Sequence, residues 1–130
     1  MRKTIDHFTK EDLQEALRPI ASLISKSEKA QRKLASGTWQ HSMLRDNLRA
    51  LNIAYALMNT EADETNSFAR DGLQEALRAL ASMISKTEKT QVKFSPGTSQ
   101  HTLARNRLKA LRIASALITR SLKSSLAERK

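Results

Sequence analysis

Residues 13–31 read LQEALRPIASLISKSEKAQ, and residues 73–91 read LQEALRALASMISKTEKTQ. With the same offset, 28 of the 51 positions from 8 to 58 carry the residue found at positions 68 to 118. Such self-similarity identifies a tandem duplication. The chain is divided into copy one at about 8–60, copy two at about 68–120 and a basic C-terminal tail at 121–130.

Each copy predicts two helices with one apolar seam apiece. Seam residues that alternate in four- and three-residue steps are typical of helices packed in a bundle. The first helix of copy one carries Leu13, Leu17, Ile20, Ile24, Ser27, Gln31 and Leu34. The second carries His41, Leu44, Leu48, Leu51, Tyr55 and Met58. Copy two repeats both seams, so each of the four predicted helices has an apolar seam that must pack against another helix.

Turn and cap residues separate these helices. Gly37-Thr38 and Pro96-Gly97-Thr98 mark the two hairpin turns, and Thr9 with Asp12 is a candidate N-cap for the first helix. Asn66 or Ser67 is the candidate for the third. Short turns make neighbouring helices antiparallel. We therefore predict a single all-α domain over residues 1–130, an up-down-up-down four-helix bundle of two helical hairpins with pseudo-two-fold symmetry.

Composition limits the class of protein. The chain has no cysteine, which excludes disulfides and thiolate chemistry and suits the reducing cytosol. The N-terminus lacks the apolar core of a signal peptide, and no stretch approaches the roughly 18 apolar residues of a membrane span. We expect a cytoplasmic protein, monomeric or homodimeric, that does not enter a membrane.

Positive charge is concentrated in the second half. Residues 1–65 hold 10 basic and 9 acidic side chains, whereas residues 66–130 hold 13 and 4. At about 100° per residue, five basic side chains of the last helix fall on one face and predict an exposed stripe. These are Arg105, Lys109, Arg112, Arg120 and Lys123.

A second basic cluster is expected where the two hairpin turns meet. Copy two contributes Lys86, Lys89, Lys93 and Arg105, and copy one contributes Lys26, Lys29, Lys33 and Arg45. Basic residues near a helix C-terminus also favour the helix dipole, and a charged surface keeps a protein in solution. The cluster is therefore either a binding surface or an ordinary solvated face.

The seam turns polar near the same end in both copies. If the bundle closes as predicted, Gln31 and His41 approach Gln91 and His101. Such a layer is either a wet, hydrogen-bonded end of the bundle that fixes its register or a pocket for a small ligand or anion.

Catalytic and metal-binding patterns are missing from the sequence. Glu-x-x-His pairs, a Gly-rich phosphate loop and a Gly-x-Ser-x-Gly elbow do not occur. Histidine with glutamine is a poor metal-ligand set. We expect a protein with no enzymatic activity, no metal and no cofactor.

Three hypotheses of function remain. The first is a small helical adaptor or regulator that recognises an acidic macromolecular partner, protein before nucleic acid, through the stripe and the basic end. The second is a nonspecific nucleic-acid-binding protein that uses the same residues, although aromatic side chains for base stacking are scarce. The third is a small-ligand or anion sensor built on the polar layer.

Overall fold

The computed structural model of the chain describes residues 8–59 and 69–129. Within these ranges the fold is all-α, with four helices in the order α1 (Lys10–Arg32), α2 (Trp39–Asn59), α3 (Arg70–Gln91) and α4 (Ser99–Arg129). Residues 121–129, predicted as a tail, continue α4. Residues 60–68, which connect the two copies, lie outside the described ranges.

Helix α1 begins with the predicted capping box. The backbone N–H of Asp12 donates to Oγ1 of Thr9 at 3.0 Å, and the backbone N–H of Thr9 donates to Oδ2 of Asp12 at 3.0 Å. Helix α3 differs, because Ala69 occupies the N-cap position and supplies no side-chain hydrogen bond. The candidates Asn66 and Ser67 lie outside the described residues.

The two hairpin turns have matching geometry. Gly37 and Gly97 adopt φ angles of 92° and 93°, a region in which side chains with a Cβ are strained. Thr38 Oγ1 accepts a hydrogen bond from the backbone N–H of His41 at 3.2 Å, and Thr98 Oγ1 accepts from that of His101 at 3.1 Å. These bonds cap α2 and α4 and confirm the turn residues that the sequence indicated.

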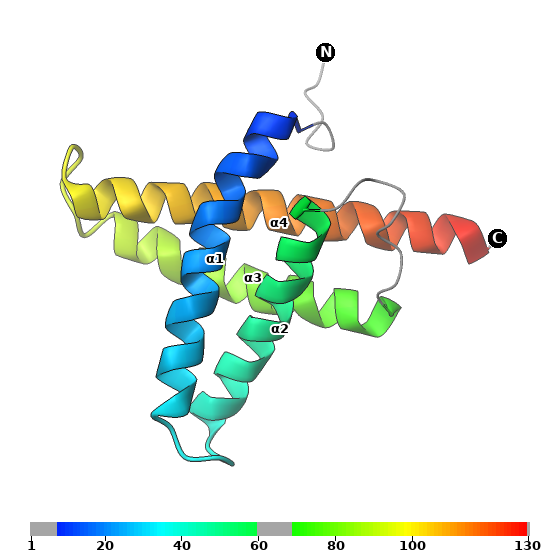
Figure 1. The fold of residues 1–130 in the computed structure, drawn as a ribbon, viewed down its shortest axis with the longest axis horizontal. Helices are drawn as coiled ribbons and strands as arrows, with labels where there is room; N and C mark the ends of the chain where they lie inside the picture. Colours follow the sequence, from blue (N-terminus) through cyan, green and yellow to red (C-terminus); the bar gives the residue numbers. More distant parts are fainter. Residues whose placement is uncertain (1–7, 60–68, 130) are drawn as a thin grey trace.

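The two hairpins cross each other. Figure 1 shows α1 and α2 lying across α3 and α4, with the two hairpin turns pointing in different directions. Helix α2 contacts α3, α1 contacts α4, and α2 also contacts α4. The expectation of four helices along one bundle axis is therefore wrong, although each hairpin is antiparallel as predicted.

Small residues explain the crossing. Ala50 of α2 is fully buried where α2 meets Ala76 of α3, and Ala110 of α4 is 1% exposed where α4 meets Ala16 of α1. Alanine lets helices approach closely, and a seam defined by large apolar residues does not reveal this second contact face. The core consequently lies at the crossing, around Ile20, Leu51, Leu80, Leu111 and Ile118.

Candidate interaction surfaces

The most basic part of the described chain is the outer half of the α3–α4 hairpin. Residues 86–112 contain seven basic side chains and one acidic side chain, Glu88. Its turn extends past α1 and away from the crossing (Figure 1). We define the basic arm as the six exposed basic residues of this half, Lys86, Lys89, Lys93, Arg105, Lys109 and Arg112.

Two members of the basic arm have contacts within the protein. Nη2 of Arg112 lies 2.7 Å from Oε2 of Glu88, which joins α4 to α3. Nζ of Lys86 donates to Sδ of Met43 in α2 at 3.5 Å. Within residues 86–112 the single carboxylate, Glu88, contacts Arg112, and Lys109 shares a groove with Asp12 and Glu15 of α1. No ion pair within 4.0 Å is found for Lys86, Lys89, Lys93 or Arg105 among the residues that the structure describes.

The predicted stripe along α4 is interrupted. Arg105, Lys109, Arg112, Arg120 and Lys123 are all exposed, as expected. Ala116, however, lies on the same face between Arg112 and Arg120 and is only 8% exposed. The exposed stripe is therefore divided at Ala116. Arg120 and Lys123 form a separate region, further along α4.

The structure does not bring the two sets of lysines together. Lys26, Lys29 and Lys33 lie toward the turn of the α1–α2 hairpin, while their counterparts Lys86, Lys89 and Lys93 lie toward the turn of the other hairpin (Figure 1). The expectation of a single basic end was wrong because it relied on both hairpins sharing one axis.

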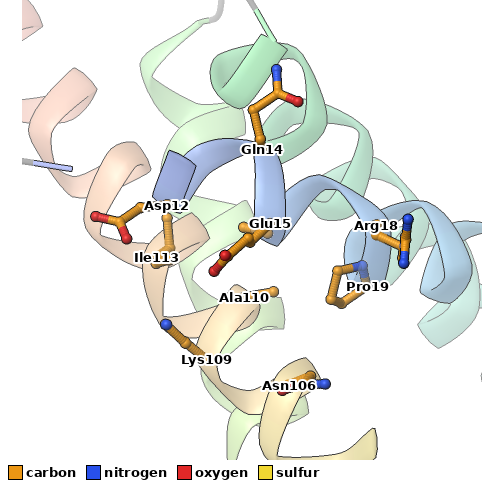
Figure 2. Close-up of a pocket in the computed structure, with 10 residues that line it drawn as sticks. Asp12, Gln14, Glu15, Arg18, Pro19, Asn106, Lys109, Ala110 and Ile113 are labelled. Atoms are coloured by element: carbon orange, nitrogen blue, oxygen red, sulfur yellow. The ribbon is translucent and has the colours of Figure 1, made fainter. Parts of the chain in front are cut away.

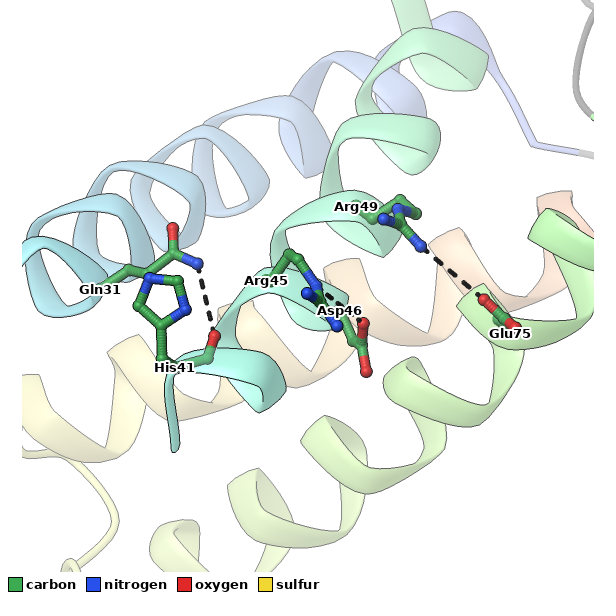
Figure 3. Close-up of polar contacts among 6 residues, drawn as sticks. All are labelled: Gln31, His41, Arg45, Asp46, Arg49 and Glu75. Atoms are coloured by element: carbon green, nitrogen blue, oxygen red, sulfur yellow. Dashed lines mark hydrogen bonds and ion pairs between the residues drawn. The ribbon is translucent and has the colours of Figure 1, made fainter. Parts of the chain in front are cut away.

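The same geometry separates the polar residues. In the α1–α2 hairpin, Nε2 of Gln31 donates to the backbone oxygen of His41 at 3.3 Å (Figure 3). Gln91 and His101 are half-buried in the other hairpin and do not approach that pair. No polar or charged residue is fully buried in the described part of the chain. The four residues do not line a common pocket, so the predicted layer does not form.

Two grooves lie where helices of different hairpins meet. The first, about 450 Å³, runs between α1 and α4. Figure 2 shows Asp12 and Glu15 of α1 on one side and Lys109 of α4 on the other. Ala16 and Ala110 contribute to its lining. Arg18 adds a second positive charge, which balances the two carboxylates.

The second groove, about 730 Å³, runs between α2 and α3. Its rim holds Arg45, Arg49 and Arg78 together with Asp46 and Glu75. Figure 3 shows two ion pairs here, Arg45–Asp46 at 3.7 Å and Arg49–Glu75 at 3.8 Å. Both are solvent-exposed, and such pairs contribute little to stability.

Apolar side chains accompany these charges. Trp39 and Met43 of α2 line the second groove, and alanines of both helices complete it. Trp39 is 69% exposed, although it is the single tryptophan of the chain. Sequence analysis did not assign Trp39 to a site, because the crossing that forms the groove was not predicted. Copy two has Ser99 at the equivalent position.

Other classes of site receive no support from the geometry of the described residues. Among residues 8–59 and 69–129, three or more histidine or acidic side chains never gather closely enough to hold a metal ion. The helices within these ranges are also too short or too polar to cross a membrane. Comparison with known protein families, curated proteins and solved structures finds no match to the chain.

Proposed function

We propose that the protein is a small non-catalytic helical adaptor or regulator that binds an acidic protein partner through the basic arm. One observation carries the proposal. Residues 86–112 of the α3–α4 hairpin hold seven basic side chains and one acidic side chain, and the hairpin turn among them extends past α1 and away from the crossing (Figure 1). Potentials of one sign attract and orient oppositely charged partners, and salt weakens that attraction.

The arm differs from its counterpart in copy one. Residues 26–52 hold six basic and two acidic side chains, a net charge of +4, whereas residues 86–112 have a net charge of +6. Arg107 and Arg112 replace Asn47 and Asn52, and Asn106 replaces Asp46. The basic arm is therefore a feature of one hairpin and not a requirement of the hairpin fold.

We also infer that the hairpins are related by an approximate two-fold axis. The buried residues Ala50, Leu51, Ile53, Ala54 and Leu57 have buried counterparts at 110, 111, 113, 114 and 117. The two grooves share equivalent residues as well, since Glu15 and Lys109 line one and Glu75 and Arg49 line the other. This arrangement supports an origin from a dimer of hairpins that later fused.

The experiment compares two triple variants that remove equal charge. Lys86, Lys89 and Lys93 are replaced by alanine in one, and Lys26, Lys29 and Lys33 in the other. A fluorescently labelled glutamate-rich peptide and a labelled mixed-sequence DNA duplex are the probes. The proposal expects the peptide to bind and the first variant to weaken binding more. Equal weakening would show a response to net charge alone, and tighter binding of the duplex would support a nucleic-acid-binding protein instead.

A further inference from the structure

We infer that the groove between α2 and α3 anchors the acidic partner by holding one of its bulky apolar side chains beside Trp39. The inference rests on the proposed function, because it assigns the same class of partner and adds a second point of contact. It is carried by Trp39 and the groove between α2 and α3, which are not part of the basic arm, and a different experiment tests it.

The groove has the composition of a protein-binding site. Tryptophan and arginine are the residues most enriched at the energetic centres of protein interfaces. Trp39 stands 69% exposed at one end of this groove, with Arg45, Arg49 and Arg78 on its rim. Its volume of about 730 Å³ lies within the usual range of about 300–1,000 Å³ for ligand pockets.

The groove continues into the basic arm along α3. Arg78 and Ser82 line the groove, and Lys86 contacts Met43, which also lines it. At about 100° per residue, Arg78, Lys86 and Lys89 fall within roughly a quarter-turn of α3, and Lys93 follows just beyond the end of the helix. All four are exposed. An acidic segment placed along this face would therefore start at the apolar groove and end at the hairpin turn.

The rim favours a peptide over a nucleic acid. Asp46 and Glu75 lie among the arginines and would repel a phosphate backbone, which carries a charge at every nucleotide. A peptide can place its carboxylates opposite Arg78 and the lysines and an uncharged residue opposite Asp46 and Glu75. A partner with both acidic and uncharged residues would therefore match a groove whose rim holds both basic and acidic side chains.

Copy one supplies a control within the same chain. Its first hairpin arm carries the same basic series, Arg18, Lys26 and Lys29 in α1 and Lys33 at its C-cap, and Arg18 lines the groove between α1 and α4. That groove has no aromatic side chain in its lining, because Ser99 occupies the position equivalent to Trp39. The lysine series is thus present twice, whereas the apolar anchor is present once.

The test selects binders from a library of random short peptides displayed on phage, using the full chain as bait. The selected peptides are synthesised with a fluorescent label. We expect acidic sequences with an aromatic or large aliphatic residue, and a blue shift of Trp39 emission on binding. Trp39→Ser and Arg78→Glu should each weaken binding by at least about tenfold, while Arg18→Glu leaves it unchanged.

Three results would overturn the inference. In the first, peptides bind, but Trp39 emission does not change on binding and Trp39→Ser binds the peptides as tightly as the wild type does. The basic arm would then act alone, and the proposed function would survive. In the second, Arg18→Glu weakens binding as much as Arg78→Glu. In the third, oligothymidylate quenches Trp39 while no selected peptide alters its emission.

Because Trp39 is exposed and Ser is the residue of copy two, Trp39→Ser should fold, which its helical circular dichroism would verify.

Discussion

The carboxylate of Glu88 lies 2.7 Å from the guanidinium of Arg112, so the only acidic residue of residues 86–112 contacts a cation of the neighbouring helix. Both side chains remain at least half exposed. An exposed pair of this kind is typically worth about 0.2–1 kcal/mol. The Glu88–Arg112 ion pair therefore affects mainly the charge of the surface and changes the stability of the fold only slightly.

Glu88→Gln should accordingly raise affinity for an acidic peptide at low salt and change the free energy of unfolding by less than about 1 kcal/mol. The matched control is Glu28→Gln at the equivalent position of copy one, where Asn52 replaces the arginine. Peptide titration and urea unfolding measure the two effects. Weaker peptide binding by Glu88→Gln would argue that the arm is not the contact surface.

The crossing of the hairpins should not tolerate larger residues. Ala50 and Ala110 are 0% and 1% exposed where the hairpins meet. Ala50→Leu and Ala110→Leu should each destabilise the protein by about 1–3 kcal/mol, because a well-packed core has no space for the added atoms. Exposed Ala21→Leu is the control and should change stability by no more than about 0.5 kcal/mol. Unchanged stability in the two buried variants would mean that the hairpins do not cross at these alanines.

Glycine substitutions should have opposite effects in turns and in a helix. Gly37→Ala and Gly97→Ala should destabilise the fold by about 1 kcal/mol, since alanine is strained at φ angles of 92° and 93°. Gly72→Ala should stabilise it by about 0.5–1 kcal/mol, because Gly72 lies within α3 and an added Cβ meets nothing within 4 Å. Thermal or urea unfolding gives all three values. A loss of stability in Gly72→Ala would contradict the helical assignment there.

The missing cap of α3 can be supplied from copy one. Ala69→Thr combined with Gly72→Asp would place at α3 the same capping box that Thr9 and Asp12 form at α1. The double variant should gain about 0.5–2 kcal/mol, the usual contribution of an N-cap. The reciprocal change, Thr9→Ala, should lose a similar amount. If neither change affects urea unfolding, the two helix starts contribute nothing to global stability.

Much of this fold follows from the sequence, while the relation between the hairpins does not. The repeat follows from comparing residues 13–31 with 73–91, and the glycine turns and the Thr9 cap are local features that a few neighbouring residues predict. The crossing depends on alanines such as Ala50 and Ala110, which resemble exposed alanines in a helical pattern. The grooves and the position of Trp39 depend on that crossing, so the sequence did not predict them. For the same reason, sequence analysis placed the two separate hairpin turns at one basic end.

The central claim is that binding depends on where the charge lies and not only on its amount. It is tested most directly by anisotropy titration of a labelled glutamate-rich peptide at about 50 and 200 mM salt. Wild type is compared with the Lys86/Lys89/Lys93 and Lys26/Lys29/Lys33 alanine variants, which carry the same net charge. We predict salt-sensitive binding that the first variant loses by at least about tenfold and the second largely retains. Equal losses in the two variants, or no binding by the wild type at either salt, would contradict the account.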